Sequence, residues 1–343
     1  MNQQRTSLLY WKENEQGEVC VFRAFGDSPV LFVPEQIDKK PVTEIGMYCF
    51  SQTRRLPEGQ LMQSRFVNDI EESVLPVSCE RKETNLQELS GNYLEEIILP
   101  DSLRKIGKCA FYNCSNLKKI SASGQTEEID SDAFMNCTHL ATLHIRTGIG
   151  EKSGLKQMLA QISWNLEVVF QKTHNPVEAV LFYPEYYEEY DEIGPAHIFK
   201  LNLTGEGFRA RQSFADGKVI LRQYDAIFPQ ACVSEPVASL CRMAFDRLYY
   251  PVDLSEDAKK LYEDYITEHC DETFSLLIAE RNLDQMYFLV KNGYANRQVL
   301  NNTIRKTSEM DWAEGTASVL AWEAEFLQDE GDCRYSFDDF DWE

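Results

Sequence analysis

Apolar residues recur every 23 positions along the first half of the chain, as Leu94, Leu117 and Leu140 show. Several other columns keep the same spacing: Ile97, Ile120 and Leu143; Ile106 and Ile129; Ala110 and Ala133; Phe111 and Phe134; Asn113 and Asn136. A fixed period of about 20 to 50 residues is the sequence signature of a repeat architecture. The pattern therefore predicts an array of stacked repeats.

Most of one repeat, residues 94–114, reads LEEIILPDSLRKIGKCAFYNC. Its first apolar positions, at 94, 97 and 99, predict a short strand. The Pro-Asp-Ser segment that follows predicts a corner, Ile106 a second inward contact, and Ala110 with Phe111 a packed turn on the far side. A unit this small cannot bury an apolar face alone, so we expect neighbours to stack and to expose a continuous strand-lined surface.

A further copy lies upstream at residues 31–50, LFVPEQIDKKPVTEIGMYCF, where Ile45 and Gly46 correspond to Ile106 and Gly107. An irregular segment, residues 51–90, separates this copy from the others. It is either a degenerate repeat around Val74 or a long loop insertion, and the sequence leaves both interpretations open.

The repeated pattern, L-x-x-I-x-L-P-x-S-L-x-x-I-G-x-x-A-F-x-x-C, resembles the BspA-like leucine-rich-repeat family over residues 31–145. The resemblance implies a β-solenoid whose exposed strands bind other macromolecules. Members of this family often resemble surface adhesins with long arrays. We accordingly expect a leucine-rich-repeat domain at residues 1–172, with an N-terminal cap and the insertion at 51–90.

After residue 145 the apolar positions change to helical spacing, which predicts a capping helix built on Leu155, Met158, Leu159 and Ile162. Residues 165–170, NLEVVF, predict a final strand, and residues 173–176 a domain boundary. A β-rich connector is then expected at 173–232, beginning with a strand over 177–183. In it, Asp216-Gly217 predicts a two-residue turn that joins 208–214 to 219–224 in a hairpin.

The register of this hairpin sets Arg211 directly opposite Arg222 and gathers four side chains on one face: Arg209, Arg211, Arg222 and Tyr224. Directly opposed arginines repel unless something negative lies between them. One interpretation is an anion site, in which the guanidinium groups bind a phosphate or a partner's carboxylates. The other is neutralisation by an internal acidic run: Glu185, Glu188, Glu189, Asp191 and Glu192.

The acidic run belongs to residues 183–192, YPEYYEEYDE. A charged run of this kind most often forms a solvated loop, which is the favoured interpretation. Contact with a basic partner is the second, and it makes the five acids candidate partner-binding residues. Paired-carboxylate catalysis of the glycosidase kind is the third.

The last third of the chain, residues 233–328, predicts helices only. We expect Ser234 to cap a first helix through 248, Ser255 to begin a second through 269, and Asp271 to cap a third through 279. Further helices are expected over 283–291, 296–306 and 311–327. The stretch at 274–300 resembles an ankyrin-like helical hairpin, which implies a protein-binding scaffold. The predicted fold class is therefore α+β, with a solenoid, a connector and an all-α helical-repeat domain.

Net charge and hydropathy argue against some classes of binding partner and location. The net charge of -22 and pI of about 4.7 give no support for nucleic-acid or anionic-membrane binding. No window approaches the roughly 18 apolar residues of a membrane span. Residues 1–13 hold too short an apolar run for a signal peptide, so we expect a cytoplasmic protein. Residues 329–343 predict a solvated acidic tail.

Candidate chemistry is sparse. The cluster of Cys109, Cys114, Cys137 and His139 is explained better by the repeat than by zinc, because Cys114 and Cys137 are 23 residues apart and no C-x-x-C pair occurs. A nucleophile elbow and a phosphate-binding loop are also missing from the sequence. We therefore predict no catalytic residue, no metal and no cofactor.

The function that these patterns favour is a non-enzymatic interaction or scaffolding protein that binds a still unidentified protein partner through its repeat surfaces. Two alternatives stay open. One is a small-anion binder or enzyme that uses the arginine-rich hairpin face. The other is a cell-surface adhesin.

Overall fold

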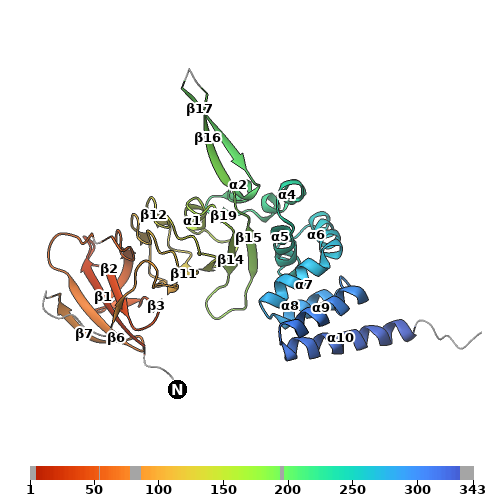
Figure 1. Cartoon of the computed structure of the whole chain (residues 1–343). Helices are drawn as coiled ribbons and strands as arrows, with labels where there is room; N and C mark the ends of the chain where they lie inside the picture. The colour runs from red at the N-terminus through yellow and green to blue at the C-terminus, as the bar shows by residue number, and fades with distance from the viewer. Residues whose placement is uncertain (1–4, 54, 78–85, 194–196, 333–343) are drawn as a thin grey trace, which may run out of the picture. The chain divides into compact units, whose positions relative to one another are not determined.

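The computed structural model describes residues 5–53, 55–77, 86–193 and 197–332 (Figure 1). The chain forms two compact units, Met1–Ile227 and Phe228–Glu343. The first contains a β-solenoid and the second is helical. The predicted fold class is therefore confirmed at this level.

Each turn of the solenoid contributes strands to two sheets. The six-stranded sheet, here called the repeat sheet, has the order β15-β14-β13-β11-β9-β3. Its parallel members are β3 (Val30–Phe32), β9 (Glu96–Ile98), β11 (Lys119–Ser123), β13 (Thr142–Arg146) and β14 (Leu166–Phe170). Ile97 pairs with Ile120, and Ile120 with Leu143, so the 23-residue period sets the register directly.

The second strand of each turn is short and enters a nine-stranded sheet, here called the cap sheet. In it, β5 (Lys40–Ile45), β10 (Lys105–Ile106) and β12 (Glu128–Ile129) lie parallel, while β4 (Gln36–Ile37) pairs with β5 in the opposite direction. Ile45, Ile106 and Ile129 are in register across these strands. A two-residue strand such as β10 makes few ladder hydrogen bonds, so it depends on both neighbours.

The third side of each turn is a tight bend around an aromatic column. The ring of Phe111 stacks on that of Phe50, with centroids 4.9 Å apart, and on that of Phe134 at 5.6 Å. The Phe111 amide donates to the Ala133 carbonyl at 2.9 Å. The thiol of Cys114 donates to the carbonyl of Phe50 and that of Cys137 to the carbonyl of Phe111, each at 3.1 Å. The repeated cysteines are therefore buried links between successive turns.

The described residues of the segment at 51–90 form neither a degenerate repeat nor a long loop. It contains a hairpin of β6 (Met62–Val67) and β7 (Ile70–Pro76), in which β6 pairs antiparallel with β1 (Thr6–Glu13). β1 in turn pairs with β2 (Val19–Gly26), and β8 (Gln87–Glu88) also adds to β2. These strands extend the cap sheet beyond β5 and close the first end of the solenoid.

The other end of the solenoid is covered by α1 (Leu155–Leu159), whose Leu155, Met158 and Leu159 are buried, as predicted. β14 is not the final strand. β15 (Ala179–Tyr183) follows it and pairs antiparallel along its whole length. The predicted boundary at 173–176 thus lies in the turn between two paired strands, and the first strand assigned to the connector belongs to the repeat sheet.

The remaining connector differs from its predicted form. The turn at Asp216-Gly217 is present, with φ of 50° and 76°, and Phe214 pairs with Val219 as expected. The hairpin ends after two pairs, because β18 (Phe214–Ala215) and β19 (Lys218–Val219) are flanked by α2 (Gly207–Ala210) and α3 (Leu221–Asp225). A longer hairpin, β16 (Tyr187–Ile193) with β17 (Ile198–Thr204), was not predicted.

The second unit consists of helices: α4 (Phe228–Ser234), α5 (Val237–Tyr249), α6 (Glu256–Glu268), α7 (Cys270–Ala279), α8 (Leu283–Lys291), α9 (Arg297–Glu309) and α10 (Ala313–Asp332). The helix predicted to begin at Ser255 is α6, and Ser255 caps it by accepting from the Ala258 amide at 3.3 Å. Two predicted caps are wrong: Ser234 ends α4, and Asp271 lies in the first turn of α7.

None of the helices in the described residues is both long and apolar enough to cross a lipid bilayer. The predicted acidic tail at 329–343 begins inside α10, and its residues from 333 onward lie outside the described part of the chain.

The aromatic column gives the first testable prediction. Phe111→Ala should lower the free energy of unfolding of the first unit by about 3–5 kcal/mol, because it opens a cavity between two stacked rings. Met135→Ala is the control, since Met135 is 47% exposed, and it should cost under about 0.5 kcal/mol. Urea unfolding followed by tryptophan fluorescence measures both. A Phe111→Ala cost as small as the control's would show that the column does not hold the turns together.

Candidate binding surfaces

Arg211, the central residue of the predicted anion site, is buried, with 2% of its surface exposed. Its Nε donates to the carbonyl of Ile162 at 2.8 Å, Nη2 to that of Trp164 at 2.7 Å, and Nη1 to those of Pro184 and Gly207 at 2.5 and 2.9 Å. These four bonds satisfy carbonyl groups where α1, β15 and α2 meet. Arg211 is thus a structural clamp.

The other three members of the predicted cluster do not share a face with Arg211. Tyr224 is buried on α3, and its hydroxyl donates to the Phe182 carbonyl at 2.5 Å. Arg209 lies exposed on α2 and forms an ion pair with Glu206 at 3.0 Å. Arg222 is exposed on α3. The predicted opposition of Arg211 and Arg222 is wrong, because Arg211 lies in the turn directly after α2 and Arg222 lies in α3, and neither belongs to the paired strands.

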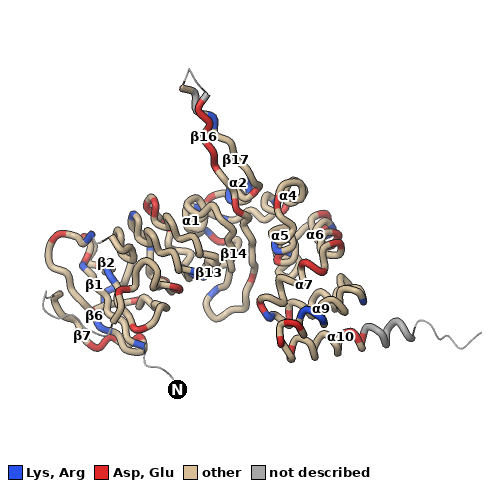
Figure 2. Tube along the Cα trace, in the orientation of Figure 1, with Lys and Arg blue, Asp and Glu red and all other residues tan. Residues whose placement is uncertain are grey.

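The five predicted partner-binding acids lie at and beyond the base of the β16–β17 hairpin, here called the arm (Figure 2). Glu185 precedes β16, and the others are in the strand: Glu188, Glu189, Asp191 and Glu192. The run is therefore an extended strand and not a loop. Asp191 accepts a hydrogen bond from Asn202 across the ladder at 2.5 Å.

The base of the arm is held rigidly. The guanidinium carbon of Arg211 lies 5.1 Å from the ring centre of Tyr186, which in turn meets the ring of Phe208 edge-on at 5.5 Å. The chain returns through Gly207, where an added Cβ would lie 2.0 Å from the Pro184 carbonyl oxygen. Only glycine allows this approach. Arg211 and the acidic run thus belong to one structure, with the arginine at its root and the acids along its length.

A second surface is the outer face of the repeat sheet. Alternation along the strands sends one set of side chains into the core and the other outward. The outward set includes a row across five strands: Phe32, Ile98, Ser121, His144 and Val169. A neighbouring row contains Glu96, Lys119, Thr142 and Glu167. The face is therefore a mixture of apolar and polar side chains held in strict register.

A polar network fixes the middle of this face. Arg146 reaches back across two strands, donating to the Ser121 hydroxyl at 2.7 Å, to Asp101 at 2.8 Å and to the carbonyl of Leu99. The Ser121 hydroxyl also lies 3.4 Å from Nδ1 of His144. Burial lowers the pKa of His144, and the positive charges of Lys119 and Arg146 lower it further. His144 is therefore neutral at pH 7.

The Ser121 and His144 pair lacks the other parts of a hydrolytic site. Ser121 is only 4% exposed, so a substrate carbonyl could not reach its hydroxyl without movement of the sheet. Within the described residues, no carboxylate is hydrogen bonded to His144, as the third group of a triad would be. The hydrogen bonds among Ser121, His144 and Arg146 instead hold these side chains in fixed orientations on the outer face.

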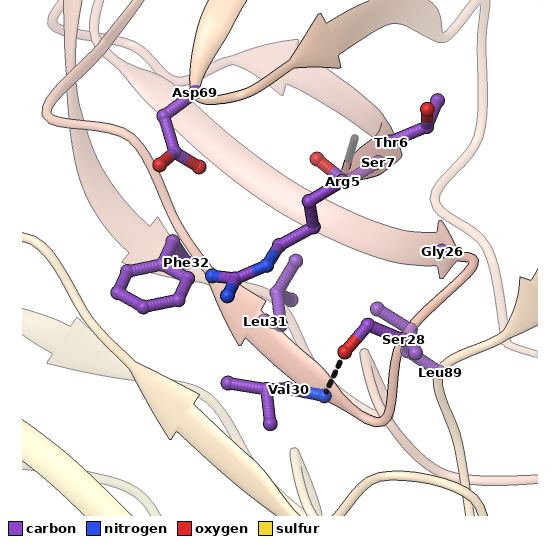
Figure 3. Close-up of a pocket in the computed structure, with 10 residues that line it drawn as sticks. All are labelled: Arg5, Thr6, Ser7, Gly26, Ser28, Val30, Leu31, Phe32, Asp69 and Leu89. Atoms are coloured by element: carbon purple, nitrogen blue, oxygen red, sulfur yellow. Dashed lines mark hydrogen bonds between the residues drawn. The ribbon is translucent and has the colours of Figure 1, made fainter. Parts of the chain in front are cut away.

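A pocket between β1, β3 and the β6–β7 turn is too small for a ligand (Figure 3). The guanidinium group of Arg5 lies over the ring of Phe32, 4.5 Å from its centre, with Asp69 on the adjoining turn. The cavity beneath has a volume of about 10 Å³, room for one water molecule at most. In the described ranges, no group of three or more His, Cys, Asp or Glu side chains is placed to hold a metal ion.

The sequence of residues 85–183 matches the family model of the BspA type leucine rich repeat region, in six copies. Residues 85–183 are a BspA-type leucine-rich-repeat region. The match extends past residue 145 to Tyr183, which agrees with β14 and β15 being strands of the repeat sheet. The BspA-type repeats thus include part of the segment that the sequence assigned to the connector.

Two solved structures are similar to this chain. The leucine rich repeat protein of T. pallidum is 21% identical, with a TM-score of 0.26, over 39% of this chain and 49% of that one. A leucine rich cell surface protein from Faecalibacterium prausnitzii A2-165 is 18% identical, with a TM-score of 0.25, over 48% of this chain and 41% of that one. The chain spans about half or less of each. No curated protein matches it.

The network on the outer face was not predicted. Ser121 and His144 are 23 residues apart and occupy the same outward position in successive repeats. A comparison of polar residues 23 positions apart, between the apolar columns, would have placed the two side chains next to each other. The same test places Ser123 beside Arg146.

The clamp leads to a second prediction. Arg211→Ala should lower the free energy of unfolding by about 3–5 kcal/mol, because four carbonyls lose their donor inside the protein. Arg209→Ala removes the same charge from a position that is 60% exposed and should cost under about 1 kcal/mol. Thermal melts of both variants with and without 10 mM inorganic phosphate provide the test. This phosphate concentration is roughly a thousandfold above the dissociation constant of a site that binds at about 10 µM. If phosphate stabilises the unmodified protein and Arg211→Ala abolishes that stabilisation, Arg211 belongs to an anion site as first predicted.

The pKa of His144 gives a third prediction. Because this pKa is lowered in the folded state, the unfolded chain binds the proton more tightly, and stability falls as the pH drops below the unfolded value of about 6.5. His144→Gln should reduce the loss of stability between pH 7.5 and 5.5, a window chosen to span that value of about 6.5. The exposed His174→Gln is the control. Urea midpoints at the two pH values report the difference, and equal losses in all three proteins would contradict the assignment.

Proposed function

We propose that this protein is a non-enzymatic interaction protein that binds a protein partner through the outer face of its repeat sheet. The observation that carries the proposal is the register of that face, in which equivalent outward side chains stand side by side on successive strands. Six strands about 4.8 Å apart make a face about 24 Å wide, which can accommodate a segment of a folded partner.

The composition of the face supports this function. Its central row is apolar or uncharged at pH 7, and the neighbouring row contains charged side chains such as Glu96 and Lys119, paired at 3.2 Å. Protein interfaces have the same arrangement of a weakly charged centre and a polar rim. Side chains that are already ordered also lose little conformational entropy on binding. The Arg146 network provides such order at the centre of the face.

The cysteines support a reducing compartment, and we propose the cytoplasm. The thiols of Cys114 and Cys137 are buried hydrogen-bond donors to backbone carbonyls, a role that requires the reduced form. Burial also raises the pKa of Cys114 to about 12, which keeps the thiol protonated and unreactive. A cell-surface adhesin remains the alternative location and role, because the repeats themselves serve either.

A capture experiment with matched variants gives the fourth prediction. The double variant Thr142→Arg/Val169→Arg places two charges on the outer face, and Met47→Arg/Met135→Arg places the same charges on the exposed bends of the third side. Full-length protein and both variants are used to capture partners from a native lysate of the source organism. The face variant should retain at least tenfold less of the partner that the unmodified protein captures.

The control variant should capture that partner as well as the unmodified protein does, provided circular dichroism shows all three folded. Equal capture by the two variants, or loss in the control alone, would overturn the assignment of the binding face.

A further inference from the structure

The arm presents features that the fold itself does not use. β16 and β17 form a two-stranded sheet by themselves, so each strand has an outer edge whose backbone groups no other described strand pairs. An isolated two-stranded hairpin is marginally stable in water, and a third strand with a shared apolar face stabilises it. The anchored base, clamped by Arg211, holds this open edge in place.

One face of the arm carries exposed apolar side chains beside its glutamates. Tyr190 pairs with Leu201, and Glu188 pairs with Leu203, so these four side chains point to the same side. Tyr190 is 66% exposed, Leu201 44% and Leu203 41%. In the described part of the chain no element packs on these residues closely enough to bury them. An apolar stripe beside an open strand edge is the arrangement that proteins normally avoid or cover.

The charge of the arm determines which kind of partner can cover its apolar stripe. The arm has four acids, all on β16, and a single lysine, Lys200 on β17. Asp191 is hydrogen bonded to Asn202 and Glu192 contacts His197. Neither Glu188 nor Glu189 has an ion-pair partner among the described residues. Two such arms would repel each other, whereas a basic segment would be attracted.

We propose that the arm binds an extended, basic peptide segment of a protein partner, which adds as a third strand beside β16. Glu188, Tyr190 and Glu192 lie on one face of β16, two residues apart. The added strand therefore places an apolar residue opposite Tyr190 and a lysine or arginine opposite each glutamate, in the order basic–x–apolar–x–basic. Backbone hydrogen bonds supply the affinity and the alternating side chains the specificity. This site is separate from the repeat sheet and does not depend on the function proposed for it.

The test uses the full-length protein and a fluorescent peptide with the core Lys-Thr-Val-Thr-Lys, followed by anisotropy. The peptide should bind, and its affinity should fall as salt rises because the paired charges are exposed. A peptide with the core Glu-Thr-Val-Thr-Glu should show at least tenfold weaker binding. N-methylation of one alternate set of peptide amides should abolish binding, while methylation of the other set should leave it intact, since only one edge of an added strand faces β16.

Matched variants of the arm locate the site. Glu188→Lys should weaken binding at least fivefold, because Glu188 faces a basic residue of the peptide. Glu189→Lys changes the net charge equally but lies on the opposite face, opposite a threonine, and should change affinity less than twofold.

Several results would overturn the proposal: equal binding of both peptides, equal effects of the two variants, indifference to both sets of N-methyl groups, or no binding at 1 mM peptide, a concentration that corresponds to only about -4.1 kcal/mol of binding free energy. Concentration-dependent self-association that Glu188→Lys or Leu201→Ser abolishes would identify a second copy of this chain as the occupant and would also reject it. The capture experiment on the repeat sheet is unaffected by any of these outcomes.

Discussion

Each turn of the solenoid satisfies its backbone and buries its apolar side chains only through the next turn. The strands that a repeat contributes to the cap sheet are as short as two residues, and the bend on the third side bonds to the following bend through the amide of Phe111. A single repeat has no core of its own. The same dependence that makes the array cooperative also fixes the register of every outward side chain, and so creates an ordered surface.

An array of this kind needs its ends closed, and the chain does so differently at each end. The cap sheet continues at the first end into the antiparallel strands β2, β1, β6 and β7. At the other end, α1 covers the core and β15 reverses direction beside β14. Two buried arginines secure the irregular chain near these closures. Arg23 donates to the carbonyls of Cys49 and Thr53 and pairs with Glu88, and Arg211 clamps the base of the arm.

Local patterns predicted those parts of the structure whose contacts lie one period apart. The columns through Ile97, Phe111 and Cys114 became strands, stacked rings and buried thiols as expected. The hairpin at 62–76 could not be found in this way, because it pairs with β1, which lies more than fifty residues earlier in the chain. Long-range pairing of edge strands leaves no periodic signal.

The candidate site residues illustrate the same limit. The turn at Asp216-Gly217 was predicted correctly, but its strands were extended into residues that Gly207 and the clamp of Arg211 hold in short helices. The arginines were therefore grouped on a face that does not exist. The acids were recognised as a set, but the run that contains them was predicted to be a solvated loop, and the partner strand β17 was not recognised.

The central claim is that the outer face of the repeat sheet binds a protein partner. Carbodiimide footprinting of carboxylates in the full-length protein, free and bound to the partner that it captures, tests this most directly. Glu96 and Glu167 project from the face, whereas Glu256 and Asp257 lie exposed on α6. The account predicts that binding protects Glu96 and Glu167 from modification and leaves Glu256 and Asp257 unchanged. Unchanged labelling of Glu96 and Glu167 in the complex would contradict it.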